Sequence, residues 1–229
     1  MKAIQHKPNL KRAAVLLFGI MMTCATVKAQ DTPCLPSHGE TDNQSAWCGS
    51  EQVIALTEGW NWISTNREVS DPLVMLQTLE TALGENATLI ENNGITTEYL
   101  GSGFWFGTLE NEGLTNDKMY LVHVSDSCTI ELAGEPASST VMITLDPGWN
   151  WIGFPSEVEM SITDFLSGFE AEVGDMIEHD GQVSEYLGYG FWIGLDTLVP
   201  GNGYLYYNAS NESKTITFSI GAKAGGVKP

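Results

Sequence analysis

Apolar and polar residues alternate with a period of two along much of this chain, which is the pattern of strands with one buried face. The clearest example places Val141, Ile143 and Leu145 on one face and Met142 and Thr144 on the other. Similar short segments follow one another with glycine-containing turns between them. The pattern predicts a mainly β protein made of antiparallel strands.

The pattern is also duplicated. GWNWIS at Gly59–Ser64 returns as GWNWIG at Gly148–Gly153, and the glycine- and aromatic-rich stretch at 90–107 returns at 177–194. The offset between copies is 89 residues at the first motif and 87 at the second. An offset so nearly constant indicates one structural unit present twice. We therefore expect two tandem, similar modules, each an antiparallel β-sandwich or small barrel with one short helix.

Turn residues refine the prediction for each module. Asn-Gly at 93–94 and Asp-Gly at 180–181 lie between alternating segments, which is typical of two-residue hairpins. In the first copy this register places Ile90 opposite Thr97, with Tyr99 on the same, core-facing side. The second copy repeats the arrangement.

Each copy also contains one helical pattern. Asp71 followed by Pro72 is typical of a helix start, and leucines follow it at helical spacing. In the second copy Ser161 and Asp164 form a capping box ahead of apolar residues with the same spacing.

The N-terminal segment has the composition of a signal peptide. Four basic residues precede an apolar stretch at 13–27, which is too short to span a membrane, and Val27-Lys28-Ala29 resembles a cleavage site. A lipoprotein anchored at Cys24 is the alternative. We expect a protein that is secreted or held on the outer cell surface, without a membrane span in the mature chain. The predicted organisation is 1–29 signal peptide, 30–50 polar lead-in, 51–136 first module, 137–220 second module and 221–229 tail.

The charge of the mature chain limits the classes of partner that we expect. The segment 1–29 carries five of the 10 basic residues and none of the 29 acidic ones, so its removal takes the formal net charge from −19 to −24. Such a surface repels phosphate backbones and anionic lipids. The composition therefore argues against nucleic acid as a partner.

Export permits disulfides. Cys34 and Cys48 bracket a polar segment with little else to order it, so we expect them to form a disulfide, leaving Cys128 as a free thiol in a strand.

Catalytic, metal and cofactor motifs do not stand out in the sequence, and we expect neither an enzyme nor a cofactor. The histidines of the mature chain do not recur between the copies. Glu91 and Glu98 do recur, as Glu178 and Glu185, on the expected outer face of each hairpin. A solvated face is the simplest interpretation, and glycosidase-like acid–base work by such a pair is a remote alternative.

Aromatic residues are the main binding candidates. Trp60 and Trp62, with their counterparts in the second copy, are expected to pack in the core. In GFWFG, Phe104 and Phe106 share a face that we expect to point inward, which leaves Trp105 on the opposite face.

Trp192 takes the same place in the second copy. Trp105 and Trp192 are then either covered by other elements or exposed platforms for stacking on sugar rings.

Tyrosines that differ between the copies add candidates. Tyr189, Tyr206 and Tyr207 stand where the first copy has Ser102, Val122 and His123. The fold accepts other side chains there, so we interpret these tyrosines as contact residues of the second module.

The whole pattern, GWNWIS followed by EYLGxGFWxG and a closing tyrosine strand, resembles tandem repeats of exported and surface proteins of Bacteroidetes. The second copy keeps the closing GxGY element at Gly201–Tyr204, whereas Asp117-Lys118-Met119 precede the tyrosine in the first copy. The resemblance implies a non-catalytic module of secreted or cell-surface proteins.

We therefore expect a non-enzymatic binding or adhesion protein, with a glycan or another surface protein as partner and carbohydrate as the candidate ligand. A structural spacer or assembly subunit is the alternative, and a small glycoside hydrolase is the remote one.

Overall fold

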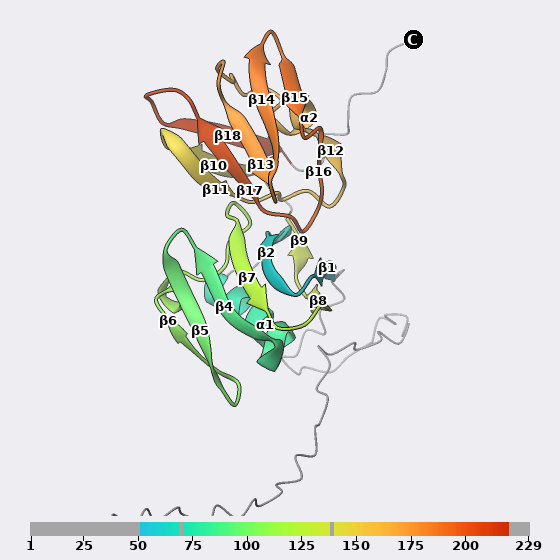
Figure 1. Cartoon of the computed structure of the whole chain (residues 1–229), viewed down its shortest axis with the longest axis vertical. Coiled ribbons are helices and arrows are strands. Elements are labelled where there is room, and N and C mark those ends of the chain that lie inside the picture. Colours follow the sequence, from blue (N-terminus) through green and yellow to red (C-terminus); the bar gives the residue numbers. More distant parts are fainter. Residues whose placement is uncertain (1–50, 69–70, 138–139, 220–229) are drawn as a thin grey trace, which may run out of the picture.

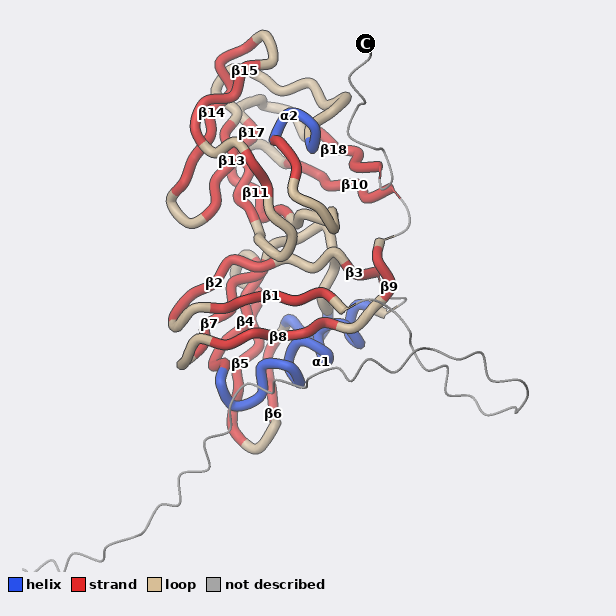
Figure 2. Tube along the Cα trace, turned by 90° about the vertical axis from the view of Figure 1, so that its right-hand side faces the viewer, coloured by secondary structure: helices blue, strands red, loops and turns tan. Residues whose placement is uncertain are grey.

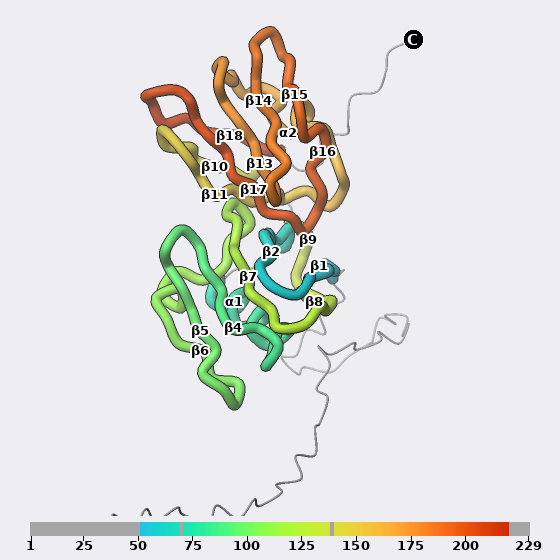
Figure 3. The backbone as a smooth tube through the Cα atoms, in the orientation of Figure 1, coloured from blue at the N-terminus to red at the C-terminus, as the bar shows by residue number. Residues whose placement is uncertain are grey.

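The computed structural model describes residues 51–68, 71–137 and 140–219. The expected signal peptide, the Cys34–Cys48 pair and the tail lie outside the described residues. Within those ranges the protein is mainly β, as the sequence predicts, with antiparallel sheets and short helices. Figures 1 and 3 show two similar groups of strands, one above the other.

The first group begins at Gln52 and ends at Pro136. Its elements are β1 (Gln52–Leu56), β2 (Gly59–Ile63), β3 (Arg67–Glu68), α1 (Pro72–Leu83), η1 (Gly84–Asn86), β4 (Ala87–Asn92), β5 (Ile95–Gly101), β6 (Phe104–Gly107), η2 (Leu109–Asn111), β7 (Tyr120–Val124), β8 (Cys128–Leu132) and β9 (Glu135–Pro136).

The second group begins at Thr140 and ends at Ser219. Its elements are β10 (Thr140–Leu145), β11 (Gly148–Ile152), β12 (Met160–Ser161), α2 (Ile162–Phe165), β13 (Met176–His179), β14 (Gln182–Gly188), β15 (Phe191–Gly194), β16 (Thr197–Leu198), β17 (Tyr204–Asn208) and β18 (Lys214–Ser219).

The main sheets have the same topology in both groups, whereas the short pairs β3-β9 and β12-β16 occupy different places in the chain order. A five-stranded sheet has the order β2-β7-β4-β5-β6 in the first module and β11-β17-β13-β14-β15 in the second. A two-stranded sheet, β1-β8 or β10-β18, accompanies each. The strands that the sequence repeats therefore occupy equivalent places, which fits a duplicated module.

The hairpin turns follow the predicted chemistry. Asn93 and Gly94 have φ of 46° and 86°, and the Asp-Gly pair of the second module has similar values. These conformations match the right-handed twist of the flanking strands. The register confirms that Ile90 pairs with Thr97, and Ile177 with Ser184.

The GWN letters form a second repeated turn. Gly59 has a φ of 96°, which glycine adopts without steric cost. Asn61 closes the turn, because its Oδ1 accepts from the Thr57 N–H at 2.9 Å and its Nδ2 donates to the Thr57 carbonyl at 2.8 Å. Asn150 makes the same pair of bonds to Asp146, both at 2.8 Å.

The helices begin where the caps predict. Asp71 accepts from the Leu73 N–H, and Pro72 opens α1, which lies against β8. Ser161 caps α2 through the Asp164 N–H, but α2 has only four residues and ends at Phe165. The apolar residues that follow α2 therefore pack from a turn rather than from a longer helix.

Each module has its own core. The first contains the buried face of α1 together with Ile90, Trp105 and Val122. The second centres on Phe154, Phe165 and Tyr204, whose rings meet edge to face. The helices and two-stranded sheets cover one side of each five-stranded sheet, and the views in Figures 1 and 2 agree on this arrangement. The opposite side of each large sheet is left open.

Candidate functional site

The open side of each five-stranded sheet carries large apolar side chains. In the first module Trp60 is 51% exposed, Leu100 59%, Phe104 57% and Phe106 65%. In the second, Trp149 is 48% exposed, Leu187 48%, Phe191 67% and Ile193 63%. Equivalent positions of the two modules thus present similar apolar surfaces, with Phe106 replaced by Ile193. We call these two surfaces the open faces. Large apolar side chains that are exposed at equivalent positions of two modules indicate a candidate binding surface.

Aromatic pairs on each open face have matching geometry. The rings of Trp60 on β2 and His123 on β7 lie 5.0 Å apart and pack edge to face. In the second module Trp149 on β11 and Tyr207 on β17 lie 5.1 Å apart. Each pair lies at one end of its face, whereas β6 or β15 forms the other end.

Trp60 and Trp149 do not pack in the core, so the sequence-based expectation for them is wrong. The preceding turn places each of them on the open side of its sheet, since Ile63 and Ile152 at the end of the same strands point inward. Trp62 and Trp151 are half-buried.

The predicted orientation of GFWFG is also wrong. Trp105 is 7% exposed and packs on Tyr99 at 5.4 Å, while Phe104 and Phe106 point to solvent. Trp192 is half-buried and packs on Tyr186 at 5.2 Å. Neither tryptophan forms an exposed platform.

A β-bulge causes this reversal. The pairing shifts by one residue between Gly101, which pairs with Phe104, and Tyr99, which pairs with Trp105. A shift of one residue exchanges the two faces of a strand. The signal in the sequence is GSG at 101–103, whose first glycine has a φ of 97°. The larger indole therefore lies inside, and the phenylalanines lie outside.

The three tyrosine candidates have three different environments. Tyr189 is 99% exposed at the tip of the β14–β15 hairpin, and Tyr207 is half-buried on the open face. Tyr206 is fully buried, so its interpretation as a contact residue is wrong. Strand parity explains the difference, because adjacent residues of β17 point to opposite sides of the sheet.

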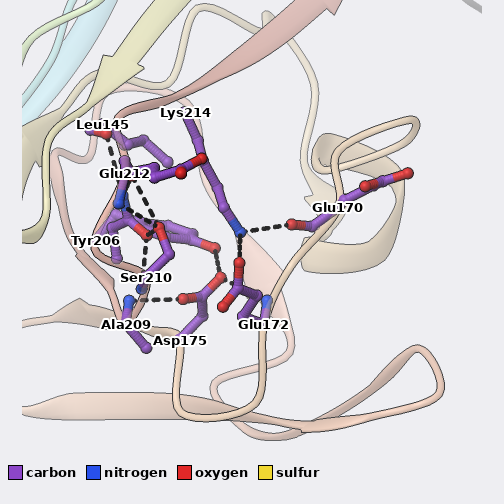
Figure 4. Close-up of polar contacts among 10 residues, drawn as sticks. Leu145, Glu170, Glu172, Asp175, Tyr206, Ala209, Ser210, Glu212 and Lys214 are labelled. Atoms are coloured by element: carbon purple, nitrogen blue, oxygen red, sulfur yellow. Dashed lines mark hydrogen bonds and ion pairs between the residues drawn. The ribbon is translucent and has the colours of Figure 1, made fainter.

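Tyr206 belongs to a polar network around Asp175, which lies beside Tyr186 of β14 (Figure 4). Its hydroxyl donates to the buried Asp175 carboxylate at 2.8 Å, which also accepts from the N–H groups of Ala209 at 2.8 Å and Glu172 at 2.9 Å. Burial, followed by the neighbouring Asp175 charge, raises the pKa of Tyr206 strongly, so the hydroxyl remains a donor.

The network supports the open face of the second module. Asp175 and Gly174 bond to the backbone of Tyr186 on β14, and Lys214 holds the same loop through a 2.7 Å ion pair with Glu172. The loop also brings the exposed Val173 beside the Gly188 backbone. The hairpin is thereby anchored to β17 and β18.

Polar groups on the open faces are acidic or neutral. Glu98 and Glu185 are exposed, and Glu91 and Glu178 lie diagonally from them on the adjacent strand. The ten strands of the two large sheets contain no Lys or Arg. Carboxylates beside aromatic rings can accept hydrogen bonds from hydroxyl groups while the rings stack on apolar surface.

Two histidines outside this network have structural partners. His123 Nδ1 lies 2.8 Å from Thr88 Oγ1, and His179 Nδ1 lies 2.8 Å from the Gly203 carbonyl. Burial, with the charge of Glu110 as the second cause, raises the pKa of Glu80 to about 7. Cys128 is a free thiol. Among the described residues, no group of three or more potential metal ligands is found, and no helix has the length and apolar character needed to cross a membrane.

A cleft of about 310 Å³ lies between the modules. It is lined by Arg67 and Glu68, by Thr115, Asn116 and Asp117, and by Thr140, Val141 and Met142. Arg67 is buried there and forms a 3.0 Å ion pair with Glu157 of the second module.

Comparison of the chain with protein-family models, with curated proteins and with solved structures finds no match in any of the three.

Proposed function

We propose that this protein is a non-enzymatic, secreted or cell-surface binding protein whose open faces bind neutral carbohydrate. The observation that carries the proposal is the exposed aromatic surface at equivalent positions of both modules. A core does not require these side chains, since Trp60 and Trp149 are about half exposed. The flat faces of sugar rings stack on such aromatic groups, and sugar hydroxyls supply donors for Glu98 and Glu185.

Charge supports a neutral ligand. The open faces offer carboxylates without Lys or Arg to balance them, and the whole chain has a formal net charge of −19. An anionic polymer would be repelled. A purely structural spacer with every repeated tryptophan in the core is less favoured, because two of the repeated tryptophans are exposed.

Binding to neutral polysaccharides tests the proposal. We expect retardation of the protein in native gels that contain at least one of β-1,3-glucan, hydroxyethyl cellulose, mannan or xylan. Trp60→Ala combined with Trp149→Ala should lower the affinity at least tenfold, because each change removes a stacking ring worth about 1 kcal/mol.

Val53→Ala combined with Met142→Ala is the matched control. Both residues are more than 60% exposed, but they lie on the two-stranded sheets. Equal losses in both double variants, or no retardation by any of the four polymers, would contradict the proposal.

A further inference from the structure

Both open faces lie on the same side of the molecule. Figure 1 shows the two large sheets in front, with α1 and the β10-β18 pair behind them. Figure 2, turned by 90°, shows the large sheets on the left and α1, α2, β10 and β18 on the right. The two views agree that the covered sides of both modules share one direction. The open sides therefore share the other.

The modules meet through equivalent backbone bonds. The Ser64 N–H donates to the Gly201 carbonyl at 2.9 Å, and the Gly153 N–H donates to the Asp117 carbonyl at 2.9 Å. Ser64 and Gly153 are repeat counterparts, as are Asp117 and Gly201. In each direction, the residue that follows the GWNW strand of one module donates to the loop that precedes the closing tyrosine strand of the other module. The two modules are related by an approximate two-fold axis.

Side chains fix this junction further. The Ser64 hydroxyl donates to the Asn202 carbonyl at 2.6 Å and accepts from the Phe154 N–H at 3.1 Å. Trp62 meets His179 edge to face at 6.0 Å.

Two glycines allow the close approach of the modules. A Cβ at Gly153 would overlap the Asn116 carbonyl, and a Cβ at Gly203 would overlap Met119 and the Ile63 carbonyl. A junction held by backbone and buried side chains does not act as a flexible linker.

We infer that the two open faces form one bivalent site for a neutral polysaccharide chain long enough to contact both modules. The inference rests on the proposed function. Both faces carry tryptophan, leucine and phenylalanine at equivalent positions, although Phe106 and His123 correspond to Ile193 and Tyr207. Two such similar faces suit a ligand that presents the same epitope repeatedly, and a polymer of neutral sugars does so. Fixed spacing makes the second contact intramolecular, which raises the avidity without new kinds of contact.

The first experiment compares polymers with short oligosaccharides from the same panel. For any polymer that binds, the matched tetrasaccharide should bind at two sites per chain and about 10²- to 10⁴-fold more weakly, the range that bivalency supplies. Trp60→Ala alone and Trp149→Ala alone should each lower the polymer affinity about fivefold, the factor that about 1 kcal/mol supplies. For the tetrasaccharide, each single variant should weaken one of the two sites by about the same factor and keep the affinity of the other.

The second experiment disturbs the junction without touching the faces. Gly203→Val places a larger side chain against Met119 and the Ile63 carbonyl. We expect polymer affinity to fall at least tenfold while tetrasaccharide binding stays unchanged. Thr144→Val, on an exposed position of β10, is the control. The single tryptophan variants keep the inference testable if Gly203→Val does not fold.

The outcomes separate the two proposals. Tetrasaccharide binding at two sites with equal polymer affinity in wild type and single variants would overturn bivalency and keep the carbohydrate function. No binding of either ligand form would overturn both. Self-association in sedimentation velocity that Trp60→Ala with Trp149→Ala abolishes, without carbohydrate binding, would instead assign the faces to contacts between copies of this chain and overturn both.

Discussion

Single residues explain why certain letters recur between the modules. Gly59 and Asn61 recur because one provides a positive φ and the other closes the turn with its amide. Tyr99 recurs because its hydroxyl accepts from the Gly103 N–H at 2.9 Å, as Tyr186 does from Gly190 at 3.0 Å. Trp60 is different: it makes one edge contact with His123 and leaves half of its surface in water. Its exposure is the residue-scale evidence for a binding role.

We predict that Tyr189 lowers the stability of the fold but contributes to binding. Its φ of 54° is unfavourable for a bulky side chain, and it is 99% exposed. Tyr189→Asn should raise the free energy of unfolding by about 0.5–1 kcal/mol, because Asn-Gly suits this turn. The same change should weaken polysaccharide binding at least threefold.

Urea denaturation and gel retardation measure the two effects. Ser102→Asn, with a φ of 56° in the equivalent turn, is the control that should stabilise without weakening binding. A Tyr189→Asn variant that binds as well as wild type would remove Tyr189 from the site.

Tyr206→Phe tests the buried network. Removing the hydroxyl takes one donor from the Asp175 carboxylate, so we expect a loss of about 1–3 kcal/mol in the free energy of unfolding. Tyr207→Phe, on the adjacent, half-buried position, should change it by less than about 0.5 kcal/mol. Equal effects of the two changes in chemical denaturation would contradict the role of the Asp175 contact.

At the scale of elements, the order of strands in the large sheets decides what each module exposes. Helix α1 and the two-stranded sheets cover one side, and β6 and β15 are the outer edge strands. The bulges beside these edges turn Phe104 and Phe191 outward and Trp105 inward. An irregularity of one residue thus determines which aromatic rings are available to a ligand.

Glu80 on α1 is predicted to make stability depend on pH. Its pKa is raised from 4.5 to about 7, by burial first and by the Glu110 charge second. The folded state therefore binds the proton more tightly than the unfolded state, and stability falls as the pH rises from about 4.5 to about 7. Because the carboxyl is partly exposed, screening limits the effect to roughly 1 kcal/mol.

Glu80→Gln should flatten this dependence and raise the unfolding free energy at pH 8. Glu85→Gln, an exposed acid just after α1, is the control. Denaturation curves at pH 5, 6, 7 and 8 measure both, and a slope that Glu80→Gln leaves unchanged would exclude Glu80 as its source.

At the scale of the whole molecule, the junction makes two modules act as one body. The reciprocal bonds of Ser64 and Gly153, together with the Arg67–Glu157 ion pair, link the modules in both directions. The last residue of the repeated motif is serine in the first module and glycine in the second. The Ser64 hydroxyl donates to the Asn202 carbonyl, whereas Gly153 has no room for a side chain.

We expect wild-type protein to unfold in one cooperative transition. Gly153→Val, which would force a side chain against the Asn116 carbonyl, should split the calorimetric transition into two and lower the first by several degrees. Ser167→Val, exposed after α2, should leave one transition. Two transitions already present in the wild type would show that the junction does not couple the modules.

The sequence by itself determined the local features of this protein. The period of two predicted strands, Asn-Gly and Asp-Gly fixed the hairpin registers, Asp71 and Ser161 marked the helix starts, and the 89-residue offset revealed the duplication. These features depend on neighbours a few residues apart, or on comparison of the chain with itself.

The tertiary structure decided which side of each sheet is covered. The inside and outside of GFWFG depended on a bulge, and the exposure of Trp60 depended on which side of β2 the helix and small sheet occupy. The hydrogen-bond partner of the buried Tyr206 hydroxyl is Asp175, 31 residues away. Alternation of side chains along a strand identifies its two faces but does not show which of them belongs to the core. Packing between segments distant in the chain makes that choice.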